Sequence, residues 1–163
     1  MVPLTEYLNT SYRPDCEYLE GEILERNVGE WDHSRLQVSL AARLGNREKQ
    51  WGIVVAIAQR VQVQATRFRV PDITVMTTHP PPETRILRTP PFLCIEILSP
   101  SDRMAEMQSR ISDYLEFGVA YVWLINPRNR QAFIYTANQV EEVKDGILRT
   151  SNPNIEVPLS ELA

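Results

Sequence analysis

The chain has 163 residues, a length that predicts one domain over 1–163, since single domains commonly run to about 100–200 residues. Apolar residues make up 43% of the sequence, which supports a real core and argues against wholesale disorder. The net charge of −4 differs from the positive balance of proteins that coat DNA, and the basic residues are fifteen arginines but only two lysines. Any mechanism that needs a lysine must therefore use Lys49 or Lys144.

Neither a membrane segment nor a secretory leader is predicted. The longest apolar run, residues 52–58, is far shorter than the roughly 20 residues that a membrane-spanning helix needs. The N-terminus lacks the basic start and the apolar stretch of a signal peptide. Cys16 and Cys94 are isolated, so the sequence predicts two reduced thiols rather than a disulfide or a zinc site. A cytoplasmic location is expected.

The first predicted element in chain order is a hairpin over 15–27, with its turn at Glu20-Gly21. A helix is predicted over 31–49, because leucines recur one turn apart from Leu36 to Leu44. Three strands are predicted next, over residues 52–58, 60–65 and 68–76. The proline-rich segment 77–91 must be irregular, and its length suits a functional lid as well as a solvated excursion.

Residues 92–98 form the most hydrophobic predicted strand, and this strand carries a single carboxylate. Proline and an acid two residues later make 99–102 typical of a helix start, and Gly118 is expected to end that helix. A strand over 121–125 and its hairpin partner over 131–136 follow. This order predicts an α/β or α+β fold, in which helices flank a mixed β-sheet.

Two of the predicted strands carry an isolated acid. Glu96 lies within Leu-Cys-Ile-Glu-Ile-Leu, where a carboxylate is costly to bury unless it is paired, hydrogen-bonded or bound to metal. Asp72 is similar, because it follows Pro71 within another apolar strand. Two acids on neighbouring strands make an all-oxygen site suited to Mg²⁺. The structural alternative is that Asp72 caps a turn and Glu96 pairs with an arginine.

The motifs around these two acids resemble the active-site half of PD-(D/E)XK nucleases. The first is Arg69-Val-Pro-Asp72-Ile-Thr-Val, and Cys-Ile-Glu96-Ile-Leu-Ser-Pro100 follows with its acid 24 residues later. More closely, the chain resembles the Uma-type family of putative restriction endonucleases over most of its length. The resemblance also includes Glu17-Tyr-Leu-Glu-Gly-Glu22, His33, Ser99-Pro-Ser-Asp-Arg103 and Tyr114-Leu-Glu-Phe-Gly118-Val-Ala-Tyr-Val-Trp123-Leu-Ile-Asn-Pro127.

The resemblance implies a restriction-endonuclease-like core in which Asp72 and Glu96 hold Mg²⁺ or Mn²⁺. The metal would neutralise the scissile phosphate of DNA, lower the pKa of a bound water and steady the leaving oxygen. Glu22 (or Glu17) and His33 carry over as supporting site residues, although an ordinary polar role at the helix start explains His33 equally well. The implied activity is endonucleolytic hydrolysis of DNA phosphodiester bonds, and a homodimer would match the two-fold symmetry of duplex DNA.

The sequence departs from the superfamily pattern at the catalytic lysine. That lysine usually sits two residues after the second acid, where this chain has Leu98. The Uma-type family typically carries it on the next helix, fourteen residues after the glutamate, and this chain has Arg110 there. Arginine stabilises phosphate charge but cannot readily deprotonate to activate water, so weakened or lost catalysis stands as the alternative to an active enzyme. The alternative function is an inactive nuclease fold that acts as a DNA-binding or protein-interaction module.

Overall fold

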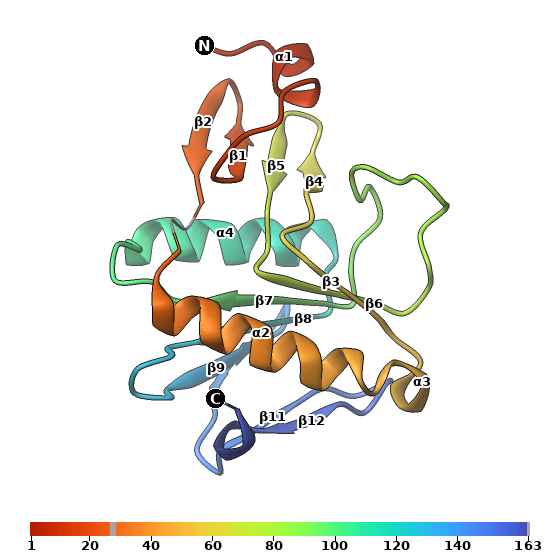
Figure 1. Ribbon diagram of the computed structural model, residues 1–163, viewed down its shortest axis with the longest axis vertical. Helices are drawn as coiled ribbons and strands as arrows, with labels where there is room; N and C mark the ends of the chain where they lie inside the picture. Colours follow the sequence, from red (N-terminus) through yellow and green to blue (C-terminus); the bar gives the residue numbers. More distant parts are fainter. Residues whose placement is uncertain (27–28, 163) are drawn as a thin grey trace.

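The computed structural model describes residues 1–26 and 29–162 (Figure 1). Its elements, in chain order, are α1 (Leu4–Leu8), β1 (Cys16–Leu19), β2 (Glu22–Glu25), α2 (Trp31–Gly45), α3 (Glu48–Trp51), β3 (Val54–Ile57), β4 (Val61–Gln64), β5 (Arg67–Arg69), β6 (Ile73–Met76), β7 (Leu93–Ile97), α4 (Met104–Phe117), β8 (Tyr121–Ile125), β9 (Ala132–Tyr135), β10 (Val140–Glu142), β11 (Ile147–Arg149), β12 (Glu156–Pro158) and the 3₁₀ helix η1 (Leu159–Glu161). Within the described residues, no helix is both long and apolar enough to cross a membrane.

The strands form three sheets. The central sheet has six strands in the order β10-β9-β8-β7-β6-β3, and it is mixed, because β7 and β8 are parallel while the other neighbours are antiparallel. A four-stranded sheet, β2-β1-β5-β4, contains the predicted hairpin and lies on the α4 side of the molecule, and β11 and β12 form a small third sheet (Figure 1). The predicted α/β organisation, with a mixed sheet and flanking helices, is confirmed.

The two long helices pack against opposite faces of the central sheet. Leucines of α2, from Leu36 to Leu44, pack in one core with Ile95 and Ile97 of β7. The buried face of α4 packs in a second core that contains Cys94 of the same strand. Successive side chains of a strand point to opposite faces, so Glu96 faces α4 together with Cys94.

The strand predicted over 68–76 is two strands in different sheets. β5 ends at Arg69 in the four-stranded sheet, and β6 begins at Ile73 in the central sheet. Pro71 lies at the junction, where it cannot donate a ladder hydrogen bond and restricts the backbone of the residue before it. The chain therefore passes from one sheet to the other within residues 70–72, and Asp72 sits at this junction.

Both long helices differ from their predicted bounds. α2 ends at Gly45 and α3 forms separately, where the sequence predicts one continuous helix. α4 begins at Met104, later than predicted. The N–H of Ser99 donates to Asp102 Oδ2 (2.8 Å), and the N–H of Asp102 donates to the Ser99 carbonyl (3.0 Å). The acid thus closes a turn ahead of the helix instead of occupying its first turn.

Gly118 ends α4 in the left-handed region, at a φ of +112°, and a Cβ added there would lie 3.2 Å from Pro90 Cγ. Gly118→Ala is expected to lower the free energy of unfolding by about 1–2 kcal/mol, because an alanine is strained at this φ. Urea denaturation measures the change. The control is Gly45→Ala, at the last residue of α2 with open space around it, and it is expected to leave stability unchanged or raise it by up to ~1 kcal/mol. Equal stability of Gly118→Ala and wild type would contradict the expectation.

Candidate active site

Asp72 and Glu96 converge where β6 begins and β7 ends. The two strands pair in antiparallel register through Ile73 and Ile95, and one residue further this register places Asp72 opposite Glu96. Both acids are buried, with 6% and 0% of their surface exposed. Asp72 Oδ1 and Glu96 Oε1 lie 3.4 and 2.7 Å from one atom, Nη2 of Arg26. The two motif acids therefore point to a single position from adjacent strands.

Each carboxylate is also oriented by a donor of its own. The backbone N–H of Ile97 donates to Asp72 Oδ2 (2.7 Å), and the Tyr114 hydroxyl donates to Glu96 Oε2 (2.6 Å). His33, in the first turn of α2, places Nε2 3.1 Å from Asp72 Oδ1. Fixed donors of this kind hold a carboxylate in one rotamer. The structure thus brings His33 to Asp72, and a supporting role for it stays a prediction.

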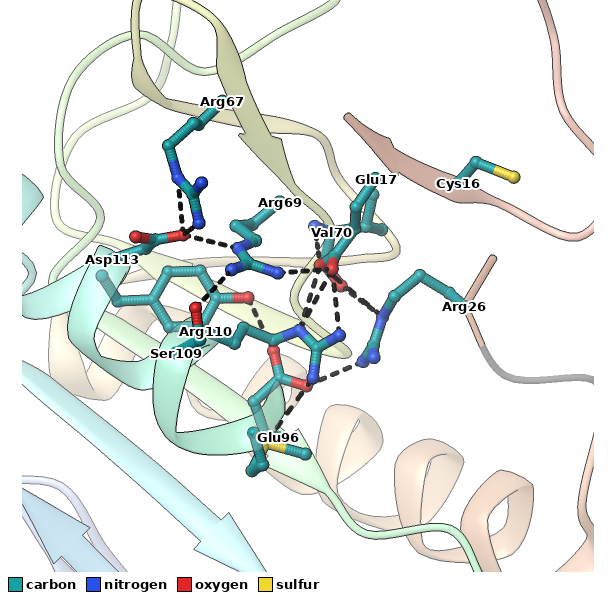
Figure 2. Close-up of polar contacts among 12 residues, drawn as sticks. Cys16, Glu17, Arg26, Arg67, Arg69, Val70, Glu96, Ser109, Arg110 and Asp113 are labelled. Carbon is teal, nitrogen blue, oxygen red and sulfur yellow. Dashed lines mark hydrogen bonds and ion pairs between the residues drawn. The ribbon is translucent and has the colours of Figure 1, made fainter. Parts of the chain in front are cut away.

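Glu17, on β1, is a further buried acid of the site and lies among three arginines (Figure 2). Arg110 donates from Nη2 to Oε1 (2.9 Å) and from Nε to Oε2 (3.1 Å). Arg69 Nη1 donates to Oε1 (3.0 Å), and Arg26 Nε lies 3.8 Å from Oε2. The backbone N–H of Val70 also donates to Oε2 (2.9 Å). Glu17 therefore ties the hairpin to α4 and to the junction between the two sheets.

Of the two hairpin acids that the resemblance offers, the structure brings Glu17 to the site and not Glu22. Glu22 begins β2 beside the hairpin turn, pairs with Leu19 and is exposed. The opposite end of β2 leads into the site through Arg26. The expectation for Glu22 is therefore corrected, because the turn reverses the chain and leaves this residue at the outer end of the hairpin.

A series of alternating charges continues from Glu17 to Asp113 on α4. Arg69 Nε and Arg67 Nη2 donate to Asp113 Oδ2 (2.7 and 2.9 Å), and Figure 2 shows both arginines directed at this carboxylate. The cluster contains four carboxylates and four guanidinium groups, those of Glu17, Asp72, Glu96, Asp113, Arg26, Arg67, Arg69 and Arg110. Counted as fully ionised groups, these eight side chains carry no net charge, and exposed Glu20 lies 3.9 Å from Arg67 at the edge of the cluster.

The surroundings of Glu17, Glu96 and Asp72 shift the pKa values of these three buried acids in different directions. Burial raises the pKa of Glu17, but Arg110 and Arg26 outweigh burial and hold this pKa at about 2. Burial raises the pKa of Glu96 above its usual range, and the nearby charge of Asp72 adds to the rise. Burial also raises the pKa of Asp72. The hydrogen bond with His33 and the charge of Arg26 outweigh the effect of burial and leave this pKa below its usual range. Asp72 is therefore the stronger acid of the converging pair.

Arg110 lies on α4 at the position where the resembled family carries its lysine, but it pairs with Glu17 rather than Glu96. Three hydrogen bonds join it to that carboxylate, and another joins Nη1 to Met107 Sδ (3.7 Å). Lys49 and Lys144 are both exposed, on α3 and after β10. The cations of the site are therefore arginines.

Arg26 is the site residue that no sequence motif indicates. It directly follows β2, only 8% of its surface is exposed, and its guanidinium meets both Asp72 and Glu96. A cavity of about 180 Å³ beside it, also lined by His33, Gln37 and Asp72, opens toward solvent. The sequence gives one indirect signal, since an acid within an apolar strand needs a partner.

The converging carboxylates fit a divalent cation at the position that Arg26 Nη2 occupies. Mg²⁺ and Mn²⁺ prefer oxygen ligands, and Mg²⁺ is often bound through one or two carboxylates with several waters. No metal-binding group of three or more His, Cys, Asp or Glu side chains occurs in residues 1–26 and 29–162, so the protein offers a carboxylate pair rather than a closed cage. Asp72 and Glu96 would hold such an ion, and the guanidinium of Arg26 now lies between them.

The protein is similar to known proteins in both its sequence and its fold. The sequence matches the Uma2 family, described as a putative restriction endonuclease, over residues 4–160. The fold is similar to the crystal structure of a putative nuclease belonging to DUF820 from Anabaena variabilis, with a TM-score of 0.84 and 24% sequence identity over 99% of this chain and 97% of that one. A search of curated proteins found no match. Because the family match spans nearly the whole chain, the protein belongs to the Uma2 family.

Proposed function

We propose that this protein is a DNA endonuclease that hydrolyses phosphodiester bonds at Asp72 and Glu96 with the help of Mg²⁺ or Mn²⁺. The observation that carries the proposal is the convergence of Asp72 Oδ1 and Glu96 Oε1 on one cation position from adjacent strands. Two buried acids that share one nitrogen form the arrangement that a divalent ion can bridge.

In this proposal, the protein's own residues hold the reacting groups in place. Asp72 and Glu96 bind the ion, which when present neutralises phosphate charge and lowers the pKa of a bound water. The Ile97 N–H and the Tyr114 hydroxyl keep the two carboxylates oriented while substrate enters. The cavity lined by His33, Arg26 and Asp72 is the route by which the scissile phosphate would approach Asp72.

Cleavage assays test the activity. Purified protein is incubated with supercoiled plasmid, single-stranded DNA and branched DNA in Mg²⁺, Mn²⁺ or EDTA. We expect nicked or linear products in the metal-containing reactions and intact DNA in EDTA. Intact DNA of every type at millimolar Mg²⁺ and Mn²⁺, with a folded protein, would contradict the proposal. Cleavage that is unaffected by EDTA would contradict the metal requirement.

A second candidate function is a nuclease fold that binds DNA without cutting it. The observation that favours it is Arg110, since arginine replaces the family's lysine and its guanidinium is held by Glu17. Arginine stays protonated, so it cannot serve as a base toward water.

Arg110→Lys separates the two functions. If the site is a weakened enzyme, cleavage by Arg110→Lys is expected to rise about tenfold or more, because a lysine that leaves Glu17 can release a proton, which an arginine cannot, and a general base contributes about 10²–10⁴-fold. The matched control is Arg69→Lys, another buried arginine that pairs with Glu17, and it should bring no gain. Inertness of both variants and wild type in metal, with DNA binding retained in a gel-shift assay, would support the binding module.

We further propose that the substrate is DNA, that the protein forms a homodimer and that it is located in the cytoplasm. A two-fold dimer would place two sites on the two strands of a duplex. Sedimentation with and without a DNA duplex tests the dimer. The two buried, unpaired cysteines, Cys16 and Cys94, are compatible with a reducing compartment.

A further inference from the structure

Arg26 occupies an unusual position for a buried cation. Its Nη2 lies 2.7 Å from Glu96 Oε1 and 3.4 Å from Asp72 Oδ1, its Nε donates to the Val70 carbonyl (3.2 Å), and Nε is 3.8 Å from Glu17 Oε2. One guanidinium therefore reaches three acids and a carbonyl at the point where two sheets meet. Figure 2 shows it between Glu17 and Glu96.

The protein has a physical reason to keep a cation at this point when no metal is bound. Asp72 and Glu96 are both buried, and two neighbouring carboxylates repel each other strongly where water does not screen them. A buried carboxylate also loses hydration that only a partner can replace. Arg26 supplies the missing positive charge from within the chain, so the carboxylates keep their converging orientation.

A divalent ion at this site would compete with Arg26 for the same carboxylates. Asp72 Oδ2 and Glu96 Oε2 already accept hydrogen bonds from Ile97 and Tyr114, so a divalent ion held by the two acids would use Asp72 Oδ1 and Glu96 Oε1, the atoms that Arg26 Nη2 contacts. A guanidinium and a divalent cation at one position would repel each other across a few ångströms. Only one of the two cations can occupy the position between the carboxylates.

We infer that Arg26 is a resident counter-ion that competes with the divalent metal for Asp72 and Glu96. This inference rests on the metal site of the proposed function and assigns a further residue to it. In the metal-free protein Arg26 neutralises and positions the carboxylates. Metal binds when the guanidinium withdraws, so Arg26 sets how much metal the site requires.

The structure provides space for the withdrawal. Arg26 itself lines the cavity of about 180 Å³ that Asp72 also lines, so this cavity is the direction in which its side chain would withdraw. Exposed Asp15 lines the same cavity and could accept the displaced guanidinium. Because Arg26 must vacate its position, the apparent metal affinity is reduced by the fraction of time that the position is free.

Arg26→Met tests the competition. Methionine keeps an unbranched side chain but removes the charge, so the carboxylates are open to an ion. Isothermal titration of the full chain with Mn²⁺ should show binding roughly tenfold or more tighter than in wild type, as expected if the position is free about a tenth of the time in wild type. Without metal the melting temperature of Arg26→Met should be lower, and Mn²⁺ should raise it more than it raises that of wild type.

The matched control is Arg69→Met. Arg69 is also a buried arginine of the cluster, but its side chain donates to Glu17, Asp113 and Ser109. The Arg69→Met substitution should lower the melting temperature of the protein without increasing its affinity for Mn²⁺. Arg26→Gln serves as a second variant if Arg26→Met does not fold, and circular dichroism establishes folding for each protein. Adding Asp72→Asn to Arg26→Met should abolish the gain, which locates it at this site.

The outcomes separate the inference from the proposed function. Tighter Mn²⁺ binding that depends on both Arg26 and Asp72 supports the inference. Equal or weaker binding by folded Arg26→Met, with Asp72-dependent binding in wild type, overturns the competition and leaves the metal site standing. A gain that persists after Asp72→Asn also overturns the competition. No Mn²⁺ binding by folded wild type, Arg26→Met or Arg26→Gln overturns both.

Discussion

Glu17→Gln is expected to lower the free energy of unfolding by about 3–5 kcal/mol, because removing one partner of a buried ion pair leaves charges without compensation. Glu17 is fully buried, and the substitution would leave Arg110 and Arg69 with an amide in place of a carboxylate. The free energy of unfolding is measured by urea denaturation near neutral pH. This acid joins the hairpin, α4 and the sheet junction, so its loss weakens three packed parts together.

The same acid predicts how stability depends on pH. Its pKa is about 2 in the folded protein against an ordinary 4.5. A lowered carboxyl pKa stabilises the folded protein above pH 4.5, and this stabilisation is lost as the pH falls from 4.5 through about 2. The gap between the two pKa values corresponds to roughly 3 kcal/mol. The stability difference between wild type and Glu17→Gln should therefore shrink as the pH falls through this range.

Glu22→Gln is the control for both measurements. It makes the same chemical change on the same hairpin, but Glu22 is exposed, so its effect should stay within about 0.5 kcal/mol. If Glu17→Gln were as stable as Glu22→Gln at neutral pH, the proposed role of Glu17 in holding the arginines would be incorrect.

Asp72→Asn is expected to remove most metal binding and cleavage, with rates falling on the order of 100-fold or more, since even residues that only orient metal ligands account for about 10–100-fold. The amide is nearly isosteric with the carboxylate but lacks the charge that a divalent ion needs. It also leaves Arg26 with one acid fewer at its Nη2. Mn²⁺ titration and initial rates of plasmid nicking measure the two effects.

The control for this substitution is Asp32→Asn. Asp32 lies in the first turn of the same helix that carries His33, is exposed and pairs with Arg128 at 3.8 Å. It should leave metal binding and cleavage unchanged. Retained metal affinity and cleavage in a folded Asp72→Asn protein would remove Asp72 from the centre, and with it the assignment of the site.

Local sequence patterns predicted most of the elements that position the site. The leucines from Leu36 to Leu44 place α2 against one face of the central sheet, and the alternation along 93–97 places Glu96 on the other. Pro71 in a long apolar stretch could have indicated the break between β5 and β6, because proline interrupts a strand ladder. The last strands, from β10 onward, carry too few apolar residues in alternation to be predicted.

The sequence predicted the site less completely than the fold. It drew attention to Asp72 and Glu96 because an acid within an apolar strand is costly, and it offered Glu17 only as an alternative to Glu22. Arg26 was missed, since it lies 70 positions from Glu96 in the chain and no local pattern distinguishes it from the other arginines.

By itself, the sequence determined the class of fold, the family resemblance and which two acids need a partner. The fold class follows from side-chain periodicity and the two acids from the cost of burying charge, which are properties of short segments, whereas the resemblance follows from the order and spacing of the motifs. Only the tertiary structure decided what the partner is. The packing of the hairpin against the sheet junction brings Arg26 between Asp72 and Glu96 and binds Arg110 to Glu17, because contacts between segments distant in sequence depend on how whole sheets meet.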